Sequence, residues 1–220
     1  MLAACGAEQP QPPALPAPPA LNPETGPATP TAPREVVRAV FLGDSYTVGV
    51  GAGMGDGYVD RVAEVLGWDA VQAGQSGTGY VSEGRGGDRA PYGERVDDVA
   101  AAAPDVVVVQ GSTNDVGVPA AEVGAAAADL YADLAAAVPG ADIVVVGPLA
   151  PPDVPLSEIE AISDALAIAA AHHGLLYVDP LGEAWLTPPE GLYADGLHPD
   201  AEGYAVFADE LLDHLEAAGF

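Results

Sequence analysis

The 220-residue sequence contains no lysine, and its only basic residues are six arginines, set against 33 aspartates and glutamates. The formal net charge is therefore −27 at pH 7. Proteins that bind nucleic acid or anionic lipid headgroups need patches of lysine and arginine, which so acidic a surface does not offer. We expect no nucleic-acid partner and no direct attraction to anionic lipid.

Cysteine and long apolar runs are also scarce. Cys5 is the only cysteine, which excludes a disulfide within the chain. No stretch reaches the roughly 18 consecutive apolar residues that a transmembrane helix needs. Hydrophobic residues nevertheless make up 49% of the sequence, enough for one α/β domain with a sizeable core.

The N-terminal segment differs in composition from the rest. Residues 6–33 hold ten of the 22 prolines, which favours a disordered, extended spacer over a proline-rich ligand for a binding module. Leu2-Ala3-Ala4-Cys5 directly before it is similar to the cleavage box of bacterial lipoprotein signals; the alternative is a chance tetrapeptide in an alanine-rich chain. We predict a lipobox-like start and tether over 1–33 and a folded domain over 34–220. The protein would be secreted or held at a bacterial cell surface, with the membrane reached only through a lipid anchor on Cys5.

From residue 36 onward, short apolar runs alternate with amphipathic stretches, as strands alternate with helices. The expected strands are 36–42, 69–73, 105–110, 141–147 and 175–179. The expected helices are 57–67, 88–103 after Pro91, 119–138 with Pro119 in its first turn, 156–174 between Ser157 as N-cap and Gly174 as C-cap, and 200–219. This alternation predicts an α/β fold, a flavodoxin-like three-layer α/β/α sandwich with a five-stranded parallel sheet.

Polar, glycine-rich segments follow these strands. In open parallel sheets the active groups lie beyond the carboxyl ends of the strands. The loops that meet at that edge are 43–56, 74–88, 111–118, 147–155 and 180–199. Four segments there carry chemistry: GDSYTVG (43–49), GQSGTGY (74–80), GSTNDVG (111–117) and YADGLHPDAEGY (193–204).

Together these segments offer a residue for each role in acyl transfer. That chemistry needs a hydroxyl nucleophile, a base, a group that orients the base, and donors for the developing oxyanion. Ser45 supplies a hydroxyl at the end of the first strand. His198 is the only histidine in an active-edge loop, and Asp195 lies three residues before it. Asn114 offers a side-chain amide, and Gly77 and Ser45 offer backbone N–H groups.

The other polar and aromatic residues near these segments have structural interpretations. Cationic side chains suit a helix C-terminus, which accounts for two histidines, and a third lies near the end of the last helix: His172, His173 and His214. Two acids are expected to bond loop backbone, and one glycine to form a turn: Asp44, Asp115 and Gly74. Three aromatic residues either line an acyl or alcohol pocket or pack in the core or at its rim: Tyr46, Trp185 and Tyr193.

This ordered set resembles the SGNH hydrolases, the GDSL-type esterases and lipases. Gly43-Asp44-Ser45 is similar to their first block, Gly77 to the glycine of the second, Asn114-Asp115 to the third, and the Asp-Gly-Leu-His-Pro segment at 195–199 to the last. The blocks stand in the family's order over roughly residues 36–218. Tyr46 takes the place of the leucine that usually ends the first block, and the glycine of the third block lies one position early.

The resemblance implies a serine esterase that uses no metal and no cofactor. Ser45 would attack the ester carbonyl, with His198 as general base and Asp195 orienting the imidazole. The oxyanion hole would consist of the Ser45 N–H, the Gly77 N–H and the Asn114 side chain.

Two classes of function remain open on the sequence. One is an esterase, which the complete set of Ser45, Asn114, Asp195 and His198 favours. The other is a catalytically weak cell-surface module of the same fold that binds acylated glycans or a protein partner. The substrate is a small-molecule or polysaccharide-linked acyl ester or a longer lipid; short glycine-rich loops without a long apolar lid favour short acyl chains such as acetyl.

Overall fold

The computed structural model describes residues 36–86 and 88–220. The predicted tether over 1–33, including Cys5, lies outside these residues, so the lipobox and spacer stay predictions. Among residues 36–86 and 88–220, none of the helices combines the length and the apolar composition of a membrane-spanning segment.

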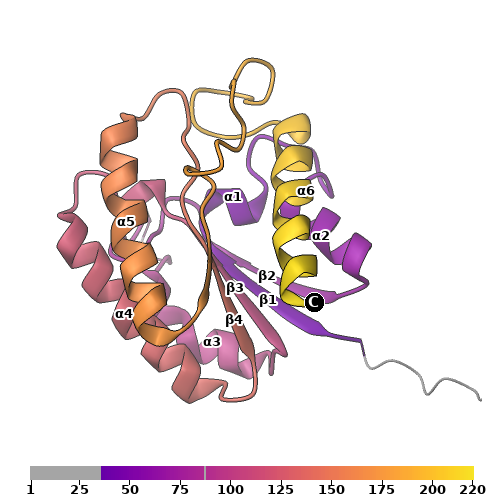
Figure 1. Ribbon diagram of the computed structural model, residues 1–220, viewed down its shortest axis with the longest axis vertical. Coiled ribbons are helices and arrows are strands. Elements are labelled where there is room, and N and C mark those ends of the chain that lie inside the picture. Colours follow the sequence, from indigo (N-terminus) through magenta and orange to yellow (C-terminus); the bar gives the residue numbers. More distant parts are fainter. Residues whose placement is uncertain (1–35, 87) are drawn as a thin grey trace, which may run out of the picture. The chain divides into compact units, whose positions relative to one another are not determined.

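A five-stranded sheet forms the middle layer of the fold (Figure 1). Its strands are β1 Arg38–Gly43, β2 Asp69–Gly74, β3 Val106–Gln110, β4 Asp142–Val146 and β5 Leu176–Val178. They lie in the order β2-β1-β3-β4-β5, and every neighbouring pair is parallel. In this order β1 lies between β2 and β3. Because the three strands are parallel, the loops that follow them meet at the same edge of the sheet. The predicted parallel α/β architecture is confirmed.

Helices cover both faces of the sheet. They are α1 Ser45–Val48, α2 Tyr58–Leu66, α3 Val96–Ala101, α4 Ala120–Ala137, α5 Leu156–His173 and α6 Ala201–Ala218, with short 3₁₀ turns η1 Tyr92–Arg95 and η2 Thr113–Asp115. Figure 1 shows α4 and α5 on one side of the sheet and α2 and α6 on the other.

Alternation along the strands builds the two halves of the core, because successive strand side chains point to opposite faces. Val106 and Val108 of β3 pack with α2 and α6, in a cluster that includes Phe41, Tyr58 and Phe207. Val107 and Val109 pack on the other face, in the cluster formed with α3, α4 and α5. Every residue of β3 is buried, as expected for a central parallel strand.

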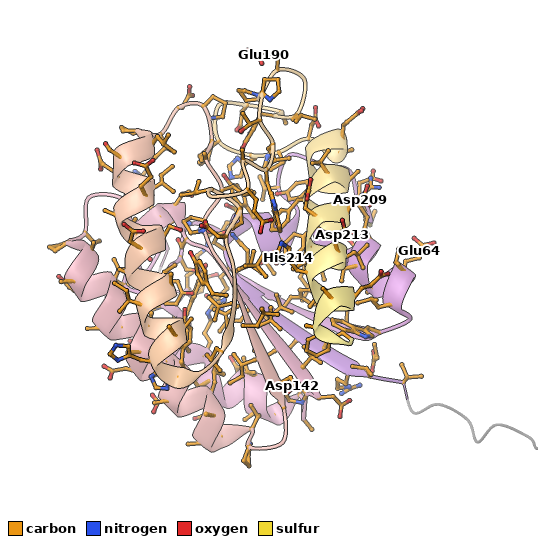
Figure 2. The ribbon with its side chains drawn as sticks, viewed as in Figure 1. Glu64, Asp142, Glu190, Asp209, Asp213 and His214 are labelled. Atoms are coloured by element: carbon orange, nitrogen blue, oxygen red, sulfur yellow. The ribbon has the colours of Figure 1, made fainter. Side chains whose placement is uncertain are left out.

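Acidic side chains lie on the outside of these layers. Figure 2 shows Glu64 on α2, Asp142 at the start of β4, and Asp209 and Asp213 on α6, all of them exposed. They contribute to the strongly negative surface and stand apart from the sheet edge described below.

Several local predictions need correction. Ser157 is not the N-cap of α5, because the helix already begins at Leu156 after Pro155, and no side chain caps it. Pro119 is the N-cap of α4 rather than part of its first turn. The stretch 88–103 divides into η1 and the short α3, since Arg95 has a non-helical φ/ψ between them. Gly174 does end α5 in a left-handed conformation, as predicted.

Candidate active site

Ser45 lies where β1 gives way to a single helical turn, α1, which the sequence did not predict. The strand ends at Gly43, where a Cβ atom would collide with the Thr47 hydroxyl. Asp44 then caps the turn, since its Oδ1 accepts a hydrogen bond from the Tyr46 backbone N–H at 2.8 Å. Ser45 is thereby fixed as the first residue of α1 at the carboxyl edge of the sheet, and it is 6% exposed.

His198 joins Ser45 to Asp195. Its Nε2 lies 3.1 Å from Ser45 Oγ and its Nδ1 lies 3.0 Å from Asp195 Oδ2. Because an ionised carboxylate only accepts hydrogen bonds, the Nδ1 atom carries the proton that points at Asp195. Nε2 is then free to accept the proton of the Ser45 hydroxyl. The structure thus brings together three residues that are up to 153 positions apart.

Asp195 is held in its ionised form by the same short loop. Its Oδ1 accepts hydrogen bonds from the backbone N–H groups of Leu197 at 2.8 Å and His198 at 2.6 Å. The hydrogen bond with the His198 ring, followed by these two backbone bonds, lowers the pKa of Asp195 to about 2. The carboxylate therefore fixes both the backbone of the loop and the tautomer of the ring.

Tyr46 ties the nucleophile turn to the histidine loop. Its hydroxyl donates a hydrogen bond to the Leu197 carbonyl oxygen at 2.6 Å, and its ring meets the His198 ring edge-on at a centroid distance of 6.0 Å. Tyr46 is buried and does not line the pocket. The alternative that it packs, rather than lines an acyl or alcohol pocket, is the correct one.

Two of the predicted oxyanion donors are available. Ser45 is the first residue of a helix, so its N–H has no acceptor within the helix. Neither this group nor the Gly77 N–H donates a hydrogen bond to another described residue. Gly77 adopts φ +82°, a conformation that favours glycine. Both groups lie on the wall of the same pocket.

Asn114, the third predicted donor, also lines the pocket but is partly engaged elsewhere. Its Nδ2 donates to the Thr78 carbonyl oxygen at 2.9 Å and to Asp44 Oδ2 at 3.2 Å. An amide nitrogen carries two hydrogens, so donation to an oxyanion requires that the longer bond, the one to Asp44, be shared or released.

Asp44 is fully buried beneath this amide. Burial raises its pKa to about 7, against the lowering effect of the Tyr46 N–H and of His198. We assign the Gln110 amide so that its nitrogen donates to Asp44 Oδ1 at 3.2 Å and its oxygen accepts from the Gly111 N–H at 3.1 Å. Asp44 thus bonds loop backbone as predicted, and it also holds two side-chain amides.

Asp115 fixes the loop that follows β2. The buried carboxylate accepts backbone hydrogen bonds from Tyr80, Val81 and Ser82 at 2.8, 3.2 and 2.8 Å. The predicted structural role is confirmed. Gly74, however, is not a turn residue: it ends β2, and a Cβ there would meet the Val48 backbone nitrogen at 2.8 Å.

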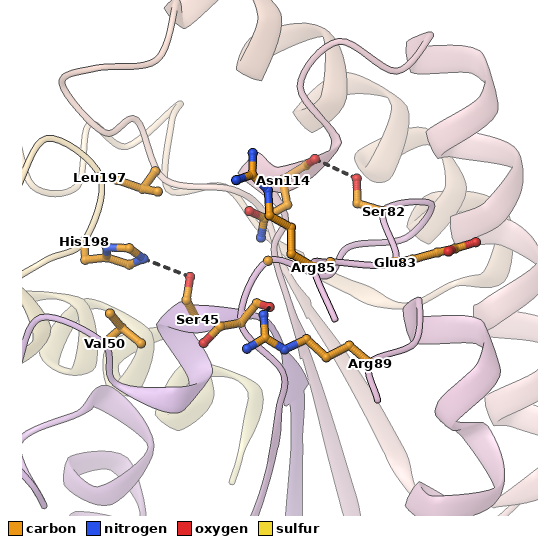
Figure 3. Close-up of a pocket in the computed structure, with 12 residues that line it drawn as sticks. Ser45, Val50, Ser82, Glu83, Arg85, Arg89, Asn114, Leu197 and His198 are labelled. Atoms are coloured by element: carbon orange, nitrogen blue, oxygen red, sulfur yellow. Dashed lines mark hydrogen bonds between the residues drawn. The ribbon is translucent and has the colours of Figure 1, made fainter. Parts of the chain in front are cut away.

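A pocket of about 630 Å³ opens over Ser45 and His198 (Figure 3). Apolar lining comes from Val50 and Leu197, and most of the remaining wall is glycine, serine or charged. The sequence interpretation missed Arg85 and Arg89, which also line it. Arg85 lies inside the predicted edge loop 74–88 and Arg89 one residue beyond it, in a chain with only six basic residues, and this placement is the signal that could have found them.

The other predicted structural residues lie outside the pocket. Trp185 is buried against Phe207, and the Tyr193 hydroxyl donates to the Ala150 carbonyl oxygen at 3.3 Å. His172 and His173 form the last turn of α5, and His214 Nε2 lies 2.7 Å from Glu183 Oε2. Across the described residues, no group of three or more His, Cys, Asp or Glu side chains is arranged to hold a metal ion.

The strand order, with a serine and a histidine paired at the carboxyl edge, defines the class: a hydrolase of the SGNH type. The chain belongs to the GDSL-like Lipase/Acylhydrolase family, whose sequence model matches residues 41–206. It is 33% identical over 182 residues to GDSL lipase Rv0518 of Mycobacterium tuberculosis, in an alignment that covers 77% of this chain and 78% of that relative. The family resemblance drawn from four sequence blocks is therefore confirmed.

Solved structures share the fold at lower sequence identity. TesA superposes with a TM-score of 0.69 at 23% identity, covering 82% of this chain and 98% of that one. Est24, a carbohydrate acetylesterase from Sinorhizobium meliloti, gives a TM-score of 0.68 at 17% identity and covers 83% of this chain and 99% of its own. These likenesses concern the fold and agree with the three-layer architecture.

Proposed function

We propose that the protein is a serine esterase that hydrolyses short-chain carboxylic esters, acetyl esters above all. The observation that carries the proposal is the chain of contacts from Ser45 Oγ through His198 to Asp195, at 3.1 and 3.0 Å. A hydroxyl beside an unprotonated ring nitrogen, with the opposite nitrogen fixed by a carboxylate, is the arrangement that activates a serine nucleophile.

In the first half of the reaction, Ser45 Oγ attacks the ester carbonyl carbon while His198 Nε2 takes the hydroxyl proton. The negative charge passes to the carbonyl oxygen, which the N–H groups of Ser45 and Gly77 and the Asn114 amide would stabilise. Asp195, ionised at all working pH values because of its low pKa, balances the imidazolium. The bond to the alcohol oxygen then breaks, and His198 gives its proton to that oxygen.

In the second half, water replaces the alcohol. His198 takes a proton from the water as its oxygen attacks the acyl carbon of the Ser45 ester. The tetrahedral species again places its oxyanion among the same donors, and collapse returns the proton to Ser45 Oγ and releases the carboxylic acid. One ester and one water give one alcohol and one acid.

The lining of the pocket supports a short acyl group. A long acyl chain needs a continuous apolar wall, because each methylene removed from water contributes about 0.8 kcal/mol. Here Val50 and Leu197 are apolar, whereas Ser76, Ser82 and Arg85 would leave a long chain against polar groups. An acetyl group needs little apolar contact, and the alcohol part can then be a small molecule or a polysaccharide.

The test is hydrolysis of a 4-nitrophenyl ester series from acetate to dodecanoate, with Ser45→Ala as the blank. We expect kcat/KM to be highest for acetate or propionate and to fall steadily with chain length. Activity that peaks at octanoate or beyond would overturn the short-chain assignment, and equal activity in the blank would overturn the esterase assignment itself.

A further inference from the structure

Most arginines in the described part of the chain are committed to structural contacts. Arg38 pairs with Asp69 at 2.6 Å and Arg61 with Asp56 at 3.5 Å. Arg95 is buried, and its guanidinium donates to backbone carbonyl oxygens and to a threonine hydroxyl. These three side chains are therefore either neutralised by a carboxylate or locked inside the fold.

Arg85 and Arg89 are different, because both line the pocket over Ser45. Neither forms an ion pair with any described residue, although the chain carries a net charge of −27. Both side chains are exposed. The protein is acidic, yet these two cations at its pocket have no carboxylate partner within 36–86 and 88–220. This suggests that an anionic ligand pairs with them.

Arg89 is held beside the oxyanion donors. Its Nη1 donates to the Ser76 carbonyl oxygen at 2.6 Å, a contact that positions the guanidinium without neutralising it. The same Nη1 lies 3.8 Å from the point where a Cβ on Gly77 would stand. The other guanidinium hydrogens stay available for a ligand, since Arg carries five N–H donors.

Arg85 lies on the same side of the pocket. Figure 3 shows its side chain extending toward Asn114, while the carboxylate of Glu83 points away from Ser45. Glu83 is the acidic residue that lines this wall, and with its carboxylate turned away the two guanidinium groups are the charged side chains that the wall presents to the pocket over Ser45.

Hydrogen bonds hold both ends of the loop that carries Arg85 and Arg89. Asp115 holds its first part through three backbone hydrogen bonds, and Gln75 Oε1 accepts from the Ala90 N–H at 2.9 Å near its end. A binding group on a fixed loop loses less conformational freedom when a ligand binds. The anchored loop ends, together with the Arg89 contact to Ser76, limit the freedom that is lost when an anion binds.

We propose that the natural substrate carries an anionic group, such as a carboxylate, on the alcohol part of the ester, and that Arg85 and Arg89 bind it. The proposal rests on the proposed function, because an acetyl group has no ionisable atom and the anion must then belong to the alcohol. Guanidinium groups suit planar, two-oxygen anions. An acetylated sugar acid satisfies this chemistry, and its neutral counterpart does not.

The experiment compares two matched esters, 3-acetoxybenzoate and the uncharged 3-acetoxybenzamide, through the ratio of their kcat/KM values. We expect the wild-type ratio to favour the anionic ester. Each single substitution, Arg85→Gln or Arg89→Gln, should lower the ratio about threefold and the double substitution about tenfold, as expected for exposed charge pairs. The ratio cancels any general loss of activity in the variants.

Two control variants separate local from global charge. Arg38→Gln removes the same charge at a distant site and should leave the ratio at its wild-type value. Glu83→Gln removes a negative charge from the same wall and should raise the ratio.

Raising NaCl from about 0.05 to about 0.5 M should lower the wild-type ratio toward that of the double variant, because salt screens exposed charges. An unchanged ratio in the double variant, or a wild-type preference for the neutral ester, would overturn the proposal.

A binding measurement keeps this proposal distinct from the esterase proposal. NMR titration of Ser45→Ala with each ester reports affinity without turnover. Tighter binding of the benzoate, lost in the triple variant that also carries Arg85→Gln and Arg89→Gln, supports the anion site even where hydrolysis is absent. Equal affinities for the two esters reject the anion site while leaving the esterase reaction untouched.

Discussion

Asn114 donates its side-chain amide to Asp44 Oδ2 at 3.2 Å, and this bond links the third sequence block to the first across 70 positions. Asp44 is buried beneath the pocket, whereas Asn114 forms part of its wall. The carboxyl group therefore orients an amide that we propose as an oxyanion donor, and it competes with the oxyanion for the same nitrogen.

Replacing Asn114 by alanine should lower kcat by about 10²–10³, with a smaller change in KM, because an oxyanion donor acts mainly in the transition state. Steady-state kinetics on 4-nitrophenyl acetate measures both values. A rise in KM with an unchanged kcat would mean that the Asn114 amide stays on Asp44 and Thr78 and binds only the ground-state substrate.

Asp44 should make stability depend on pH. Its pKa is 3.8 in an ordinary setting and about 7 in the fold, so the folded state binds this proton more tightly than the unfolded chain. Stability from this group is fully present below pH about 4 and is lost as pH rises toward about 7, on the order of 4 kcal/mol. The lowered pKa of Asp195 acts in the opposite direction but only as pH falls from about 4 toward about 2.

Urea denaturation of wild type and Asp44→Asn between about pH 4 and pH 8 checks this expectation. The wild type should lose stability relative to the variant as pH rises, since the asparagine side chain does not titrate. Parallel curves for the two proteins would show that the Asp44 carboxyl has an ordinary pKa in the fold.

Tyr46→Phe should reduce kcat about threefold to tenfold while the protein stays folded. The substitution removes the hydroxyl that donates to the Leu197 carbonyl oxygen, a bond worth about 1 kcal/mol, and leaves the buried ring in place. We expect the loss because this bond holds the loop that presents His198. Undiminished kcat would mean that the hydrogen bonds of Asp195 to the loop are sufficient on their own.

The sequence was sufficient to predict the strands, which follow from hydrophobic periodicity, and the site residues that lie at the strand ends. Apolar runs marked the five strands, and the rule for carboxyl edges brought Ser45, Asn114 and His198 to one place. Contacts between residues that are far apart in the chain could not be predicted from the sequence. The bond from Tyr46 to Leu197 spans 151 positions, and nothing in the local pattern around either residue announces it.

Predictions from local sequence were wrong or missing where tertiary packing or an irregular backbone determines the structure. Ser157 has the side chain of an N-cap, but α5 begins one residue earlier, after Pro155. The loop that carries Arg85 and Arg89 has no periodicity from which the direction of a side chain follows. Its course depends on the buried Asp115 carboxylate, whose three backbone partners lie more than 30 positions away in sequence.

Labelling with a fluorophosphonate probe tests the central claim most directly. The probe forms a covalent bond with an activated serine, and peptide mass spectrometry identifies the residue that carries it. We predict one label on Ser45, absent in Ser45→Ala and strongly reduced in His198→Ala, with hydrolysis of 4-nitrophenyl acetate lost in step. An unlabelled wild type, or a label on another serine with hydrolysis intact in Ser45→Ala, would contradict the account.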